Sequence, residues 1–407
     1  MKKTIMIIIV LILLCSYVYI YNLATIPGNI VMFEGEKLNI KVATGLTIKQ
    51  TANYKTQLTS TNLGESINQV GSNQLNVNLF GKISLKTINL DVIPTTKVVP
   101  LGQAIGMKLY TKGVLVVGMG EIESDANTKQ KPYENSGISE GDTIIAINNT
   151  EVSDTNELIE EVNQSNGEAV KVKYIKNNEV LETSIVPAKS KNEYKLGLWV
   201  RDAAAGIGTL TFYEPSTDLF MSLGHGISDI DTEEIVEISS GELVTANVVS
   251  VIKGRKDAPG EIKGTITNGT TIGKIYKNTD FGVYGLIQNK QKVKNSSYGE
   301  IEVATREKIQ EGKASILCQV DNEGVKEYEI EIEKAYKTNN RDNKSMLIKI
   351  TDTNLIEKTG GIIQGMSGAP VIQNGKLIGA VTNVLVKDPT QGYAVFGDIL
   401  IKQMRET

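Results

Sequence analysis

Residues Gly361–Val371 read Gly-Ile-Ile-Gln-Gly-Met-Ser-Gly-Ala-Pro-Val, and this stretch decides how the C-terminal half of the chain is interpreted. Its core is Gly-x-Ser-Gly-x-Pro, centred on Ser367. A glycine two residues before a serine lets its backbone N–H turn toward the point that the serine N–H also faces. Two such donors can form an oxyanion hole for acyl transfer. We therefore predict that Ser367 is a nucleophile and that Gly365 and Ser367 donate to the oxyanion.

The residues after this motif favour a catalytic interpretation over a glycine-rich turn with an incidental serine. Val371–Val381 reads as strand, turn and strand, with Asn-Gly at the turn. Trypsin-like peptidases carry a similar Gly-Asp-Ser-Gly-Gly-Pro. Met366 replaces the aspartate that pairs with a new N-terminus in their zymogens, so activation by that ion pair is excluded. The Gly-x-Ser-x-Gly elbow of α/β-hydrolases is absent.

The chain contains one histidine, His225, in Leu-Gly-His-Gly-Ile-Ser-Asp. A lone histidine is usually structural, but no other residue can be the histidine base of a serine hydrolase here. It precedes Ser367, as in chymotrypsin-like enzymes. We predict that His225 accepts the proton of Ser367 Oγ. Spacing leaves the orienting carboxylate open among Asp352, Asp280 and Asp229, each of which could instead be a turn residue.

The composition indicates a mostly β chain of two or three folded units. The 407 residues include 38 glycines, few aromatic residues and many Val, Ile and Thr, which favours strands joined by tight turns. Lys and Arg (43) nearly balance Asp and Glu (47) without runs of like charge, so no nucleic-acid partner is expected. With one histidine and two cysteines, Cys15 and Cys318, we expect inert thiols, no metal and no cofactor.

An apolar stretch, Thr4–Tyr21, follows two lysines at the N-terminus. Eighteen helical residues at about 1.5 Å each give roughly 27 Å, close to the ~30 Å hydrocarbon thickness of a bilayer. The following Asn-Leu-Ala is a poor signal-peptidase site, so we expect residues 1–24 to be an uncleaved transmembrane anchor rather than a secretory signal. The lysines lie on the short N-terminal side, which predicts that the body of the chain is extracytoplasmic.

Residues 25–95 are expected to form a small β region. Segments such as Asn29–Phe33, Leu38–Val42 and Leu75–Leu79 alternate apolar and polar residues between turn formers. The region contains no motif to which chemistry can be attached. We interpret it as a spacer or docking domain.

Residues 96–190 contain a run, Gly137–Asn148, that reads Gly-Ile-Ser-Glu-Gly-Asp-Thr-Ile-Ile-Ala-Ile-Asn. A predicted helix, Thr155–Asn163, follows and could be capped by Ser153 or Asp154. This region resembles a PDZ domain, which binds an extended peptide as an added strand and often grips its C-terminal carboxylate. We expect a peptide ligand, with the carboxylate loop near Pro100–Gly106, although a PDZ fold used as an intramolecular brace is the alternative.

Residues 191–407 resemble the SpoIVB peptidase family, the stage IV sporulation protein B. The resemblance is carried by Leu196–Tyr213, Leu223–Thr232 and Lys358–Gly368, and it extends over the anchor and the PDZ region. It implies a chymotrypsin-like double β-barrel and a triad of His225, Asp352 and Ser367. Asn383 stands where relatives are expected to have a second histidine, so a base at that site is excluded.

The resemblance also implies a role in sporulation. Family members are anchored in the forespore membrane and face the intermembrane space. They cut themselves and a membrane-bound regulator, which releases an intramembrane protease that processes a sigma-factor precursor. Two alternatives stay open at this point. One is an HtrA-like envelope quality-control protease, although in that class the peptidase normally precedes the PDZ domain; the other is a non-catalytic PDZ adaptor with an inactive barrel.

Overall fold

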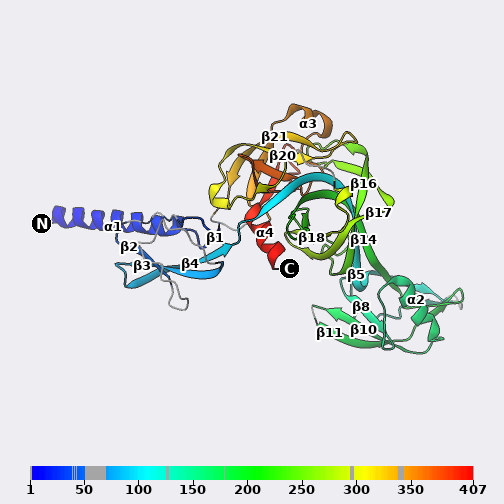
Figure 1. The fold of residues 1–407 in the computed structure, drawn as a ribbon. Helices are drawn as coiled ribbons and strands as arrows, with labels where there is room; N and C mark the ends of the chain where they lie inside the picture. The colour runs from blue at the N-terminus through cyan, green and yellow to red at the C-terminus, as the bar shows by residue number, and fades with distance from the viewer. Residues whose placement is uncertain are drawn as a thin grey trace.

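The computed structural model is built almost entirely from β-sheets (Figure 1). An N-terminal helix is followed by a small sheet, two adjoining barrels and a further unit that extends from the first barrel. The mainly β architecture predicted from composition is therefore confirmed. The structure describes residues 2–38, 40, 42, 44–50, 70–124, 128–177, 179–293, 298–337 and 343–406.

The N-terminal apolar stretch forms helix α1 (Lys2–Thr25). Within the described residues, however, no helix combines the length and apolarity needed to cross a membrane, so the predicted transmembrane helix is not found. A four-stranded sheet in the order β1-β4-β3-β2 follows, and it contains the predicted strands at 29–33 and 75–79. The predicted strand Leu38–Val42 lies partly outside the described residues. The strands are β1 (Asn29–Phe33), β2 (Leu46–Gln50), β3 (Gly71–Leu79) and β4 (Ile83–Ile93).

The first barrel is a closed ring of six strands in the order β5-β14-β15-β18-β17-β16, and pairing of β16 with β5 closes it. Its interior is filled by alternate apolar side chains such as Ile105, Leu210 and Phe220, all fully buried. The strands are β5 (Lys97–Met119), β14 (Leu198–Tyr213), β15 (Leu219–Ser222), β16 (Ile238–Ile252), β17 (Glu261–Thr279) and β18 (Gly282–Ile287), with the 3₁₀ turn η1 (Lys290–Lys292) after them.

The second barrel is also closed, in the order β20-β21-β22-β25-β24-β23, which gives the expected pair of barrels. Cys318 is fully buried in it, and burial raises the pKa of its thiol to about 12, so the prediction of an inert thiol is confirmed there. The elements are β20 (Gly312–Cys318), β21 (Lys326–Ala335), β22 (Met346–Ile350), α3 (Thr353–Thr359), β23 (Pro370–Gln373), β24 (Lys376–Val384), β25 (Gln391–Phe396) and α4 (Gly397–Arg405); β19 (Ile301–Glu302) and the 3₁₀ turn η2 (Arg306–Lys308) precede them.

The PDZ-like unit is inserted between the first two strands of the first barrel. Antiparallel pairing of β5 with β14 runs from the barrel into this unit, from Val99↔Tyr213 to Met119↔Leu198. The predicted helix is present as α2 (Thr155–Gln164), and Asp154 caps it. The other elements are β6 (Ile122–Glu123), β7 (Lys129–Gln130), β8 (Thr143–Ile147), β9 (Thr150–Glu151), β10 (Val170–Lys176), β11 (Glu179–Ile185), β12 (Ala188–Ser190) and β13 (Glu193–Lys195).

The inserted position changes the domain boundary that the sequence suggested. Residues 99–111, part of the predicted 96–190 unit, pair with β14 and β16 in the first barrel. The PDZ-like sheet begins where β5 pairs with β8, at Val114. One uninterrupted strand serves both units, so neither a turn nor a polar linker in the sequence marks the change.

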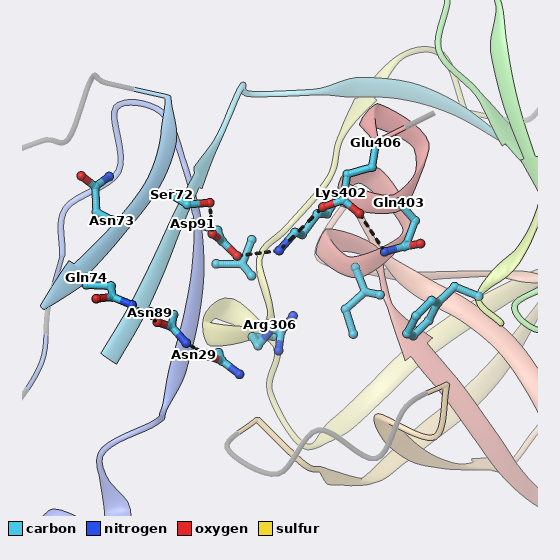
Figure 2. Close-up of a pocket in the computed structure, with 13 residues that line it drawn as sticks. Asn29, Ser72, Asn73, Gln74, Asn89, Asp91, Arg306, Lys402, Gln403 and Glu406 are labelled. Atoms are coloured by element: carbon cyan, nitrogen blue, oxygen red, sulfur yellow. Dashed lines mark hydrogen bonds and ion pairs between the residues drawn. The ribbon is translucent and has the colours of Figure 1, made fainter. Parts of the chain in front are cut away.

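The N-terminal sheet meets the C-terminal helix α4 across a cleft of about 750 Å³ (Figure 2). Asp91 of β4 accepts hydrogen bonds from Ser72 (2.6 Å) and from Lys402 of α4 (2.7 Å). Burial alone would raise the pKa of Asp91, but these hydrogen bonds and the charge of Lys402 hold it below its usual range. The start of α4 is fixed by a buried ion pair between Asp398 and Arg306 (2.9 Å). The cleft is thus a polar junction between the sheet and the second barrel.

Candidate active site

His225 and Ser367 line one cavity of about 600 Å³ between the two barrels. His225 follows β15 in the first barrel, and Ser367 lies just before β23 in the second. Both side chains are half-buried, so each is packed on one side and open to the cavity on the other. Two residues 142 positions apart in the chain, each predicted from a short motif, are therefore brought to the same place by the pairing of the barrels.

The loop that carries Ser367 is bonded directly to the first barrel. Thr209 of β14 donates its N–H to the carbonyl of Ser367 (3.2 Å). Gly368 has φ of +94°, and a Cβ there would lie 2.4 Å from the carbonyl oxygen of Thr209 and 2.5 Å from the nitrogen of Leu223. Only glycine fits this approach. The glycine after the serine is thus required by the contact between barrels, in addition to leaving room for a substrate.

The peptide groups before Ser367 are oriented by hydrogen bonds that leave two amides for an oxyanion. The carbonyl of Gln364 accepts from the N–H of Ile262 (2.8 Å), so the N–H of Gly365 in the same planar peptide points the opposite way. The carbonyl of Gly365 accepts from Thr209 Oγ1 (2.7 Å). Among the described residues, neither the Gly365 nor the Ser367 amide donates a hydrogen bond within the chain. These are the two donors that the motif predicts.

The imidazole of His225 is held by a backbone carbonyl. Its Nδ1 lies 2.7 Å from the carbonyl oxygen of Gly226, which assigns the proton to Nδ1 and leaves the lone pair of Nε2 free to act as a base. Asn278 holds the loop that follows His225. Its Oδ1 accepts from the N–H of Ile227 (2.8 Å), and its Nδ2 donates to the carbonyl of Ile227 (2.7 Å). The base is therefore supported from β17.

The hydroxyl of Ser367 donates to the carbonyl of Thr382 (2.7 Å) rather than to His225. Catalytic hydrogen bonds of this kind often form only in the complex with substrate. The hydrogen bond to Thr382 must break before Oγ can be shared with an imidazole.

The structure places Asp352 away from this cavity. It is the N-cap of α3, where its carboxylate accepts from the N–H of Leu355 (2.9 Å). Its own N–H donates to the carbonyl of Glu329 (3.1 Å), which fixes it to β21. The lining of the cavity includes none of the three candidates Asp352, Asp280 and Asp229. The sequence itself indicates the helix-cap role of Asp352, because an aspartate three residues before Leu355 can cap a short helix.

Asp280 lies in the turn between β17 and β18, on the side of the first barrel that carries His225. The carbonyl of the preceding residue, Thr279, is so close to Gly226 that a Cβ on Gly226 would approach it to 2.7 Å. The carbonyl of Asp280 accepts from Nδ2 of Asn343 (3.5 Å). Asn343 in turn accepts from Thr382 Oγ1 (3.0 Å). Backbone contacts thus connect the Asp280 turn both to the His225 loop and to the residue that holds Ser367.

Asp229 is engaged in an ion pair that the sequence analysis did not anticipate. Its buried carboxylate bonds to Arg201 of β14, and Arg201 also reaches Asp231 (2.8 Å). Burial alone would raise the pKa of Asp229, but hydrogen bonds from the N–H groups of Asp231 and Thr232 and from Arg201 hold it below its usual range. Arg201 therefore links the strand shared with the PDZ-like unit to the loop that follows His225. Both partners stood in the segments that carried the family resemblance.

Asn383 supplies a polar atom without a partner in the wall of the cavity. Its Oδ1 is buried, and no described group hydrogen-bonds to it. A buried acceptor left unpaired is costly. In the sequence, one signal drew attention to Asn383: it stands where relatives are expected to have a histidine.

A second cavity, of about 420 Å³, lies between α2 and the first residues of β14. Leu158, Ile159 and Val162 of α2 form one wall, and Leu196–Val200 forms the other. A groove between a helix and a strand edge is where a PDZ domain takes an extended peptide. The carboxylate loop expected near Pro100–Gly106 is not there, because those residues are paired inside the first barrel. The Leu196-Gly197 turn borders the groove instead.

Residues 192–401 match the family model described as SpoIVB peptidase S55, and residues 105–186 match that of the PDZ domain. Among solved structures, the active form of the Rv3671c protease from M. tuberculosis is similar, with 16% identity over 50% of this chain and 74% of that chain and a TM-score of 0.29. The HtrA-type protease AlgW with decapeptide shows 12% identity over 54% of this chain and 55% of that chain, with a TM-score of 0.30.

Proposed function

As a member of the SpoIVB peptidase S55 family, this chain is a serine peptidase with a PDZ domain, and we propose that it cuts polypeptides with Ser367 as nucleophile and His225 as general base. The observation that carries the proposal is the shared cavity: it joins the single histidine of the chain to the serine of the Gly-x-Ser-Gly motif. The Gly365 and Ser367 amides, which have no acceptor within the described chain, support the same chemistry.

In the proposed reaction, His225 Nε2 takes the proton of Ser367 Oγ as Oγ attacks the scissile carbonyl carbon. The Gly365 and Ser367 N–H groups stabilise the oxyanion. The C–N bond then breaks, and His225 returns the proton to the leaving amine. Water hydrolyses the resulting ester with His225 again as base, which regenerates the free serine.

For the orienting carboxylate we place Asp280 ahead of Asp352. The Asp280 turn contacts the His225 loop, whereas the Asp352 carboxylate already serves as a helix cap. The family resemblance favours Asp352. The two assignments therefore predict opposite effects of Asp280→Asn and Asp352→Asn on activity.

The catalytic assignment is tested by expressing the full chain beside Ser367→Ala, His225→Ala and the matched control Ser239→Ala, an exposed serine outside the cavity. A fluorophosphonate probe should label wild type and the control at Ser367. Self-cleavage fragments should appear in these two proteins and in neither active-site variant. Equal self-cleavage by Ser367→Ala would overturn the assignment and favour the non-catalytic adaptor.

The finer role rests on the family resemblance. We propose that the chain acts on the extracytoplasmic side of the forespore membrane, cuts itself and a membrane-bound regulator, and thereby triggers processing of a sigma-factor precursor. The test replaces the chromosomal gene by its Ser367→Ala form and follows the precursor during sporulation. The precursor should accumulate uncut. Normal processing, together with loss of unfolded-protein degradation, would instead favour the HtrA-like quality-control role.

A further inference from the structure

The outer edge of β14 is unpaired over most of its length. One edge pairs with β5 from Leu198 to Tyr213. The other edge pairs with β15 only at Leu210, Phe212 and Tyr213. Within the described part of the chain, the edge from Leu198 to Gly208 therefore has no strand beside it. An exposed strand edge is a template on which another extended chain can pair.

Hydrogen bonds at Thr209 show which β14 residues face this edge. Its N–H donates to the carbonyl of Ser367 and its carbonyl accepts from the N–H of Leu223, both at 3.2 Å, so both backbone groups point away from β5. In an antiparallel pair, the direction of the backbone groups alternates from residue to residue. The register runs without a shift from Ala203 to Leu210. Ile207 and Ala205 therefore also direct their N–H and carbonyl groups outward.

The unpaired edge connects the two cavities. Ala204–Ile207 lies in the wall of the cavity that holds His225 and Ser367, and Leu196–Val200 lines the groove beside α2. Between and around them the strand is built of small residues, with Ala203, Ala205 and Gly206 exposed. A Cβ on Gly206 would meet no atom within 4 Å. The face of the strand is therefore open at Gly206.

We propose that a substrate polypeptide binds as an added strand along β14, with its scissile bond at Ser367 and its C-terminal end in the groove beside α2. The inference rests on the proposed peptidase function. The occupant is a substrate polypeptide because the edge continues into the wall of the peptidase cavity and because an extended backbone can pair with the outward groups of both Ile207 and Ala205.

The carboxylate end sets the polarity of the bound chain. A C-terminal carboxylate held at the turn before β14, where Gly197 has φ of +77°, makes the peptide run antiparallel to the strand. The residues on the C-terminal side of the scissile bond then lie beside Ile207 and Ala205. From Ile207 to Gly197 the strand offers about ten residues at about 3.3 Å each, roughly 33 Å. Cleavage is therefore favoured about ten residues before a free C-terminus.

The test uses the full chain and a pool of peptides, each with about 24 randomised positions and a constant C-terminal Val that is either a free acid or an amide. Mass spectrometry records the distance of every cut from the C-terminus. With the free acid the distances should peak near ten residues. With the amide the peak should fall at least several-fold, because the carboxylate is lost.

Two pairs of variants examine the two ends of the edge. Ile159→Arg places a charge in the groove and should remove the peak. Its control, Val180→Arg, alters an exposed residue of β11 outside the groove and should retain the peak. Ala205→Pro lacks the outward N–H and should also remove the peak, whereas Ala205→Ser keeps that N–H and the peak. Thermal unfolding followed by circular dichroism shows whether each variant is folded.

The outcomes separate the two proposals. If wild type is neither labelled nor able to cut, the peptidase function itself fails. If wild type is labelled and cuts at distances that show no peak, or if the peak is the same for acid and amide, the binding path along β14 is wrong and the function stands. A peak that survives in both Ile159→Arg and Ala205→Pro would equally overturn the path.

Discussion

The two barrels each supply one reacting side chain, but they are closed in different ways. The second barrel, which carries Ser367, is formed by strands that lie together in the chain, from β20 to β25. The first, which carries His225, is interrupted after its first strand by the whole PDZ-like unit. Ser367 is therefore held by a self-contained barrel, whereas His225 belongs to a barrel whose strands β5 and β14 also build the PDZ-like sheet.

This difference indicates where regulation can enter. A ligand in the groove beside α2 would contact β14, and β14 is bonded both to the Ser367 loop at Thr209 and to the His225 loop through Arg201. Each of the two loops is thus bonded directly to β14. The difference between the contiguous second barrel and the interrupted first barrel leads to four predictions.

The largest effect should come from the carboxylate and should show which barrel supplies it. Asp280→Asn keeps the shape of the side chain but removes its charge. If the Asp280 carboxylate takes over the Nδ1 proton of His225 from the Gly226 carbonyl when substrate binds, kcat should fall on the order of 10⁴-fold, the cost of this change in a serine-protease triad. Asp352→Asn should retain activity and stability, because asparagine caps a helix as well as aspartate does. Steady-state kinetics with a cleavable peptide measure both.

The matched pair also tests the helix-cap role of Asp352. Asp352→Ala should lower the free energy of unfolding by about 0.5–2 kcal/mol, since the N–H of Leu355 loses its acceptor. A stable but inactive Asp352→Asn protein would reverse the assignment and place the acid in the second barrel.

The contact between barrels should give the next largest effect. In Gly368→Ala the new Cβ would overlap the backbone of Thr209 and Leu223, so the Ser367 loop must shift. Displacement of a reacting group by about 1 Å can cost about 10²-fold in rate, and we expect a loss of that order in kcat. Gly375→Ala is the control: its φ is also positive, at +72°, but a Cβ there meets nothing within 4 Å. Activity equal in the two variants would contradict the packing argument.

The Arg201–Asp229 pair should give a smaller effect that depends on pH. Arg201→Met leaves a buried carboxylate without its counter-ion, and because Arg201 is partly exposed we expect a loss of about 1–3 kcal/mol in the free energy of unfolding near pH 7. Since the pKa of Asp229 is lowered in the folded chain, this stabilisation is present above the unfolded-state value of about 3.9 and is lost as pH falls below it.

Urea unfolding of wild type and Arg201→Met at several pH values measures this dependence. The difference between the two proteins should shrink below about pH 4. Arg255→Met, a change at an exposed arginine, serves as the control and should show no such trend. A constant difference across the acid range would show that Arg201 acts through packing alone.

The smallest effect is expected at Asn383. Asn383→Leu removes a buried acceptor that has no partner, so the free energy of unfolding should rise by about 1 kcal/mol. If the orphaned Oδ1 accepts from a substrate N–H, KM should rise several-fold while kcat changes little. Thermal unfolding and steady-state kinetics give the two readings. Unchanged KM would leave Asn383 with no part in binding.

Features that depend on neighbouring residues could be predicted from the sequence. The glycines around Ser367, the helix after Asp154 and the uniqueness of His225 were all visible, because turn conformation, capping and composition are local properties. The catalytic pairing of His225 and Ser367 stays a prediction that the shared cavity supports. By contrast, the position of the carboxylate loop was wrong, since glycine-containing strands occur on both sides of the PDZ-like unit.

What the sequence by itself determined, then, is the set of reacting groups and the kinds of unit that carry them. The tertiary structure alone decided that β5 and β14 serve two units, that Arg201 meets Asp229, and that an unpaired edge joins the two cavities. The physical reason is that sheet pairing is made by backbone groups, which every residue has, between segments far apart in the chain. The side-chain pattern of a strand therefore does not identify the distant strand that pairs with it.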